Sequence, residues 1–213
     1  MKRKFSAADC FYDSFCTGYT LRYQNAGEFC TGNMKVSSYR VEGRGAVTLV
    51  RVSGPLGKLT EAGIFVPEEK DAPVFMMDRV KTIGKDAMSL NILEANLTKL
   101  YYRQFLNVSE DYGKIPDAEV PEGWYAKSLI QGSTAKNIQG HPEAESMLED
   151  YIAAFMKVLE FAEPCAKEAK GEKIREIREN FLSDDSQSVR YVMKALGEEK
   201  GKRFFSEVLF PAE

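Results

Sequence analysis

Two aspartates, Asp78 and Asp185, have the residue type and the setting for proton-transfer chemistry. Asp78 interrupts the otherwise apolar segment 74–80, which has the sequence VFMMDRV. If this segment is a strand, alternate side chains share a face, and Asp78 points the same way as Met76 and Val80. Cover over that face would desolvate the carboxylate and raise its pKa toward the range that a proton donor needs near neutral pH. The alternative is a strand residue that faces solvent or pairs with a neighbouring arginine.

Asp185 belongs to the segment 184–186, with the sequence DDS, which precedes a helical pattern. Short polar side chains at such a position accept hydrogen bonds from the first backbone N–H groups of the helix, and an acidic group there is stabilised by the helix dipole. Helix capping is therefore the structural alternative to a chemical role for Asp185.

Other residue types offer little chemistry. His141 is the single histidine of the chain, which argues against Ser-His-Asp triads, Cys-His pairs and multi-histidine metal sites. It precedes Pro142 at the start of a helical pattern, so we expect a helix-start position rather than catalysis. The four cysteines form no Cys-x-x-Cys pair, which indicates free thiols in a reducing compartment. Acid–base chemistry in this chain therefore depends on carboxylates, Lys, Tyr or Cys.

Apolar or alternating segments separated by Gly- and Pro-containing turns predict strands in the first half of the chain, after a short helix at 7–16. The predicted strands are 34–41, 46–52, 63–66, 74–80 and 88–93. The connections are too short for crossover helices, so neighbouring strands are expected to pair as an antiparallel meander.

The last third of the chain has helical periodicity. Apolar residues recur at three- and four-residue steps over 142–163, a second helix contains Ile174 and Phe181, a third ends at Gly197, and a short one follows at 204–209. The chain is therefore predicted to be a single α/β domain spanning 1–213. Its expected architecture is a three-layer α/β/α sandwich, with one antiparallel sheet flanked by helices.

Composition and charge argue against two classes of partner, nucleic acids and membranes. The 213 residues carry 29 basic and 32 acidic side chains and a formal net charge of −3, so no basic excess favours nucleic acid. No apolar run is long enough for a bilayer span, and aspartates interrupt the segment after the basic N-terminus, unlike a signal peptide. We expect a cytoplasmic protein without a membrane partner.

Several segments resemble the ferredoxin-dependent bilin reductase family. The segments 64–69 (IFVPEE) and 72–80 (APVFMMDRV) are similar to the family's strand, loop and aspartate-bearing strand. The segments 190–197 (RYVMKALG) and 204–210 (FFSEVLF) are similar to its closing helices and terminal Val-Leu-Phe, and 121–124 (PEGW) to its Pro-Glu-Trp-Gly segment. Together these pieces cover about a third of the chain, in the family's order.

The resemblance implies a mechanism. Asp78 falls on the family's central aspartate, which protonates a bound linear tetrapyrrole, and Asp185 on a second position at the bilin pocket. No redox cofactor would be bound, and external reduced ferredoxin would supply single electrons. The tetrapyrrole would lie between the sheet and the C-terminal helices.

The same resemblance implies binding residues. A dianionic tetrapyrrole needs cationic anchors, for which Arg51, Arg79 and Lys136 are the candidates; Lys136 matches an arginine that holds a propionate. An acidic ferredoxin needs a local basic patch, for which the candidates are Lys81, Lys85 and Lys99.

The chain departs from the family at two positions. Ala62 replaces a histidine, and Val50 replaces a glutamate one strand earlier, in comparison with some members. These departures leave the substrate and the reduced bond open. Two alternatives to a bilin reductase therefore stay open: a non-catalytic tetrapyrrole carrier, and a reductase of another conjugated ligand such as a chlorophyll catabolite.

Overall fold

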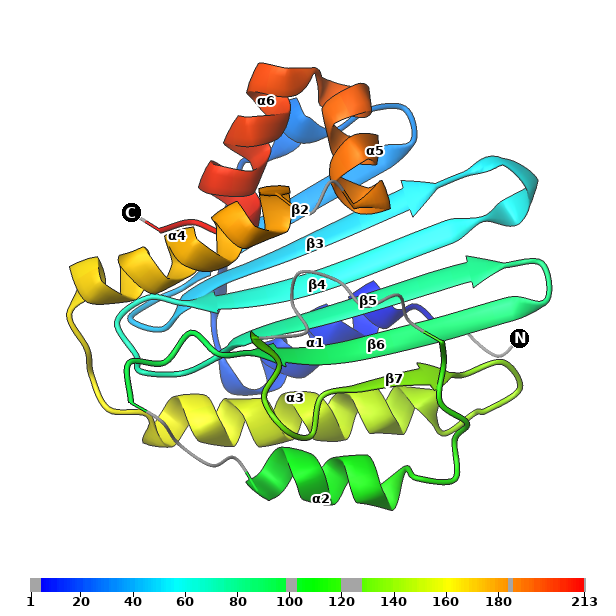
Figure 1. The fold of residues 1–213 in the computed structure, drawn as a ribbon, viewed down its shortest axis with the longest axis horizontal. Coiled ribbons are helices and arrows are strands. Elements are labelled where there is room, and N and C mark those ends of the chain that lie inside the picture. Colours follow the sequence, from blue (N-terminus) through cyan, green and yellow to red (C-terminus); the bar gives the residue numbers. More distant parts are fainter. Residues whose placement is uncertain (1–4, 99–102, 120–127, 184–185, 213) are drawn as a thin grey trace.

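The computed structural model describes residues 5–98, 103–119, 128–183 and 186–212. Seven strands of this part form one antiparallel sheet in the order β1 to β7, so each strand pairs with its neighbours in sequence (Figure 1). The strands are β1 (Leu21–Gln24), β2 (Met34–Val41), β3 (Gly45–Ser53), β4 (Leu59–Pro67), β5 (Val74–Thr82), β6 (Lys85–Leu93) and β7 (Thr134–Asn137). The expected meander is confirmed.

Helices cover both faces of the sheet, which confirms the α/β/α class. The helices are α1 (Ala7–Gly18), α2 (Arg103–Asp111), α3 (Ala144–Phe161), α4 (Lys167–Ser183), α5 (Gln187–Leu196) and α6 (Glu198–Arg203), followed by a π-helical turn at Phe204–Leu209. The sequence patterns did not predict β1, β7 and α2, because β1 and β7 have only four residues each and α2 has only nine, which is too short for a repeated apolar pattern.

The face covered by α1, α2 and α3 holds an aromatic core. Phe11 and Phe15 of α1 stack on Phe75 and Phe65 of the sheet at centroid distances of 5.6 and 5.1 Å, and Phe155 of α3 stacks on Phe75 at 5.3 Å. Offset and tilted ring pairs at such distances add to the free energy of apolar burial. This face is therefore tightly closed.

The opposite face is covered by the C-terminal helices. Ile64 and Met76 of the sheet pack with Ile177 of α4 and Val192 of α5, and with Phe205 of the π-helical turn. Figure 1 shows α4, α5 and α6 together over the β2–β4 part of the sheet. Within the described part of the chain, none of the helices has the length and apolar character that a membrane span requires.

Candidate active site

Asp78 lies at the centre of a row of side chains that crosses the sheet on the face of the C-terminal helices. Directly paired strand residues share a face, and the pairing places one residue of each strand in this row. The row consists of Val36, Val50, Ala62, Asp78, Ser89 and Ala135. Thus the two departures from the bilin reductase pattern lie in the same row as Asp78, with Ala62 on the adjacent strand β4 and Val50 one strand further away on β3.

Around Asp78 this face is partly open. Asp78, Ala62 and Ser89 are half-buried, and Val80 is 37% exposed. On the other face of the same strands, Arg79 is only 3% exposed. The strands are therefore closed on the α1 side and less completely covered around Asp78.

Burial raises the pKa of Asp78 from its ordinary value of 3.8 to about 6. No hydrogen bond or ion pair joins its carboxylate to any other residue that the structure describes. Desolvation raises the pKa because it disfavours the charged form, and no cation or N–H donor among the described residues offsets this effect. Asp78 can therefore hold a proton at mildly acidic pH and give it up near neutrality.

Polar neighbours of Asp78 come from β6. Ser89 is its direct partner in the pairing of β5 and β6, and Asn91 follows two residues later on the same face. Sequence reasoning missed both residues. The signal was present, because β6 alternates small or polar residues with Met88, Leu90 and the other apolar residues of the α1 face.

Arg79 lies on the opposite face from Asp78. Its Nε and Nη2 donate to Asp86 at 2.8 Å each, and its Nη1 donates to Glu61 at 3.2 Å. Glu61 in turn accepts a hydrogen bond from Ser6 Oγ at 2.7 Å, just before α1 begins at Ala7. Arg79 therefore fastens α1 to the sheet.

Arg51 belongs to the same cluster. Its guanidinium pairs with Asp9 of α1, and its Nε lies 3.5 Å from Glu61 Oε1. The sheet separates both Arg51 and Arg79 from Asp78, so neither lies beside that aspartate, and their role as ligand anchors stays a prediction. Strand alternation would have indicated this for Arg79, the residue next to Asp78.

Lys136 is also on the α1 side. It pairs with Met88 in the sheet, is 5% exposed, and its Nζ lies 2.6 Å from Asp117 Oδ1. Its proposed role as a propionate anchor beside Asp78 meets the same obstacle. Lys85, in contrast, is an exposed cation on the Asp78 face, at the start of β6.

Some predicted residues lie outside the described part of the chain: Asp185, Lys99 and the segment 121–124. The N-cap of α5 is Ser186, whose side chain accepts a hydrogen bond from the backbone N–H of Val189. Lys81 donates to Asp86 at 2.8 Å, with half of its side chain exposed.

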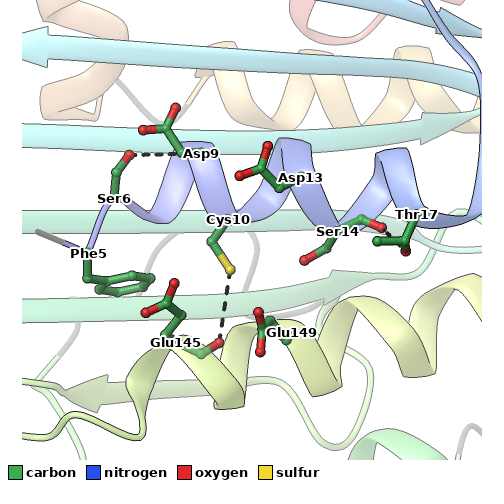
Figure 2. A pocket seen from close by; sticks show the side chains of 9 residues that line it. All are labelled: Phe5, Ser6, Asp9, Cys10, Asp13, Ser14, Thr17, Glu145 and Glu149. Carbon is green, nitrogen blue, oxygen red and sulfur yellow. Dashed lines mark hydrogen bonds between the residues drawn. The ribbon is translucent and has the colours of Figure 1, made fainter. Parts of the chain in front are cut away.

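A separate cavity of about 210 Å³ lies between α1 and α3 (Figure 2). Cys10 points into it, with its Sγ 4.0 Å from the backbone oxygen of Glu145. Burial raises the pKa of the Cys10 thiol to about 12, so the thiol stays protonated and is a poor nucleophile. No group of three or more metal-ligating side chains occurs among the described residues.

The fold of this chain is that of a known enzyme structure. Phytochromobilin synthase from tomato, solved in complex with biliverdin, superposes with a TM-score of 0.75 over 97% of this chain and 83% of the other. The two chains share one fold. Their sequence identity is 12%, and no protein-family model and no curated protein matches the chain. The likeness therefore rests on architecture, and the chemistry must be argued from the residues.

Proposed function

We propose that this protein reduces a linear tetrapyrrole that binds on the Asp78 face of the sheet, with Asp78 as a proton donor. The carrying observation is the isolated, partly accessible carboxylate whose pKa burial raises to about 6. Its position on the face of the C-terminal helices, in a fold shared with a biliverdin-bound synthase, supports the tetrapyrrole as substrate.

Reduction of one double bond takes up two electrons and two protons. In the proposed reaction, reduced ferredoxin supplies the electrons one at a time, and each added electron makes the conjugated system more basic. The protonated carboxyl of Asp78 then transfers its proton to the substrate and regains one from solvent. Asp185 is the candidate for the second proton donor, on the family resemblance alone. Lys81 and Lys85, at the turn between β5 and β6, are candidates for docking the acidic ferredoxin.

The test is an anaerobic reaction followed by visible absorption. Biliverdin is mixed with the protein, the spectrum is recorded, and a reduced-ferredoxin system is added. We expect the wild type to form a complex and then to bleach it or convert it to a discrete new band. Asp78→Asn should form the complex but reduce it about 100-fold more slowly or more, since it cannot supply the proton.

A matched control is Asp117→Asn, which removes an exposed carboxylate on the other side of the sheet from Asp78. It should leave the reaction unchanged. The wild-type rate should fall as pH rises through about 6, because the protonated fraction of Asp78 falls there. Equal rates in wild type and Asp78→Asn, or an unaltered free biliverdin spectrum, would reject the proposal.

One observation favours a second function, that of a non-catalytic tetrapyrrole carrier. In the row that crosses the sheet, Asp78 is the only titratable side chain among the described residues, because Ala62 and Val50 occupy the positions of the family's histidine and glutamate. A stable biliverdin complex whose spectrum does not change when electrons are supplied would establish the carrier. A reductase of another conjugated ligand, such as a chlorophyll catabolite, would bind no biliverdin.

A further inference from the structure

A second cavity, of about 590 Å³, lies at the β1–β3 end of the sheet. Its walls come from the end of β1, from β2 and β3, from α4 and from the residues near the C-terminus. Figure 1 shows the C-terminal end of the chain beside α4. The volume lies within the range of small-molecule sites.

This cavity is distinct from the site at Asp78. Arg40 in its wall is three strands away from Asp78, which corresponds to about 14 Å across the sheet. Between the two, Thr48 of β3 donates a hydrogen bond of 2.7 Å to the backbone oxygen of Val208, which ties the π-helical turn to the sheet. Asp78 is therefore not part of the wall of this cavity.

Arg178 of α4 is a cationic residue in the wall of the cavity. It is half-buried, and its guanidinium makes no hydrogen bond or ion pair with any other residue in the described part of the chain. An arginine offers five N–H donors in a planar fork that fits a carboxylate or a phosphate. A half-buried arginine without a described partner, in the wall of a cavity, can therefore bind an anion.

The other charged groups of the cavity already have partners. Glu28 and Glu207 both accept hydrogen bonds from Arg203, at 3.2 and 2.8 Å in the shortest contacts. Arg40 forms an ion pair with Glu68. Arg203 offsets one of the two negative charges of Glu28 and Glu207, and Arg178 balances the remaining one, so an incoming anion would be attracted mainly by Arg178 at short range.

A buried hydroxyl, that of Ser38, adds a second requirement for a ligand of this cavity. Ser38 lines the cavity and is 7% exposed, and its Oγ lies 3.3 Å from Thr48 Oγ1. Because Thr48 uses its hydrogen on Val208, Ser38 must be the donor of that contact, which leaves the Ser38 oxygen as an acceptor. The complementary ligand group is a hydroxyl or an N–H.

We propose that this cavity, through Arg178 and Ser38, binds a small organic anion that also carries a hydrogen-bond donor. The buried ring of Phe29 and the side chain of Val208 supply apolar wall beside these polar groups. The anionic group is a carboxylate or a phosphate, and the experiment distinguishes these two.

The test is a titration followed by the ¹H–¹⁵N resonances of the arginine Nε groups. Three probes are used: 4-hydroxybenzoate, benzoate and inorganic phosphate. We expect saturable binding of 4-hydroxybenzoate or phosphate with a shift of the Arg178 signal. Arg178→Gln should weaken the binding about tenfold or more, which is the usual effect of losing a charge-assisted contact. Whichever of the two binds more tightly identifies the anionic group.

The matched control is Arg22→Gln, which makes the same change at an exposed arginine on β1 that pairs with Glu42. It should bind the probes like the wild type. Ser38→Ala should abolish any preference for 4-hydroxybenzoate over benzoate, since only the former carries a donor. Absence of saturable binding by all three probes, or equal affinities in Arg178→Gln and the wild type, would overturn the proposal.

The outcome is independent of the proposed reductase. Asp78→Asn leaves the cavity intact and should bind the probes with wild-type affinity. If tetrapyrrole reduction fails while Arg178-dependent binding persists, the anion site stands by itself.

Discussion

The two faces of the sheet treat buried charge in opposite ways. On the α1 side, Arg79 is almost fully buried but bonds to both Asp86 and Glu61. On the other side, one residue earlier in β5, Asp78 has no such partner in the described part of the chain. Of these two adjacent residues of β5, Arg79 therefore belongs to a network of ion pairs, whereas Asp78 is an isolated carboxylate.

This difference separates a structural role from a chemical one. A buried charge with complete hydrogen bonding fixes the packing of the elements that it joins, and its proton affinity moves away from the physiological range. A desolvated charge without partners costs stability, and its pKa moves toward neutrality. The Asp78 face is therefore where the molecule can exchange protons, and the α1 face is where it is held together.

The largest effect is expected from breaking the network on the closed face. Arg79→Met leaves the carboxylates of Glu61 and Asp86 buried without their main cation. Removal of one partner of a buried ion pair costs about 3–5 kcal/mol of the free energy of unfolding. Urea denaturation at neutral pH measures this loss.

The control for this change is Lys81→Met, at a half-exposed cation that shares Asp86 as its partner. An exposed ion pair contributes about 1 kcal/mol or less, so this variant should remain close to the wild type. If the two variants lose equal stability, the α1 face is not held by Arg79 and the contrast between the faces disappears.

The second prediction concerns pH. Asp78→Asn should become more stable than the wild type as pH rises from about 4 to 7. The folded pKa of Asp78, about 6, exceeds its ordinary value of 3.8, so ionisation in this window destabilises the folded wild type and cannot occur in the variant. This rise in the pKa corresponds to about 3 kcal/mol at most, and partial exposure of the side chain reduces it.

Asp86→Asn is the matched variant on the closed face. Burial opposes ionisation of Asp86, but hydrogen bonds from Arg79 and Lys81 outweigh it and hold the pKa of Asp86 below its ordinary value. The stability that this carboxylate contributes is present above pH 3.8 and is lost as pH falls through the lower folded pKa. This variant should therefore be less stable than the wild type by a constant amount from pH 5 to 7. Unfolding midpoints across this range show whether the two differences diverge.

The sequence predicted the strand on which Asp78 lies but not what faces it. The alternation of 74–80 placed Asp78 with Met76 and Val80, and the structure has the same grouping. Short connections predicted the meander, because a tight turn leaves antiparallel pairing as the only option. These features depend on local sequence, which is why they could be anticipated.

The cationic anchors could not be anticipated in the same way. Arg51 and Arg79 are candidates because of their charge, and Lys136 because it matches a family arginine, whereas their positions depend on the acidic partners that fold over them. Glu61, Asp86 and Asp117 come from three different segments, so a single sequence pattern does not connect them. Likewise Arg178 was not selected, since its cavity forms only when α4 and the C-terminal residues meet the sheet.

The smallest expected effect comes from substitutions at two consecutive residues of β4, Ala62 and Gly63, which compare the packing of the two faces of the sheet. Gly63 faces α1, where an added Cβ would come within 2.8 Å of the Phe11 ring, whereas Ala62 faces the opposite side and is half-buried. Gly63→Ala should lose about 1–3 kcal/mol, as overpacking of a filled core does. Ala62→Ser adds one atom on the partly open face and should change stability by about 0.5 kcal/mol or less. Urea denaturation of both variants measures the difference; equal losses would mean that the Asp78 face is as tightly filled as the α1 face, and that Asp78 has no room for a ligand.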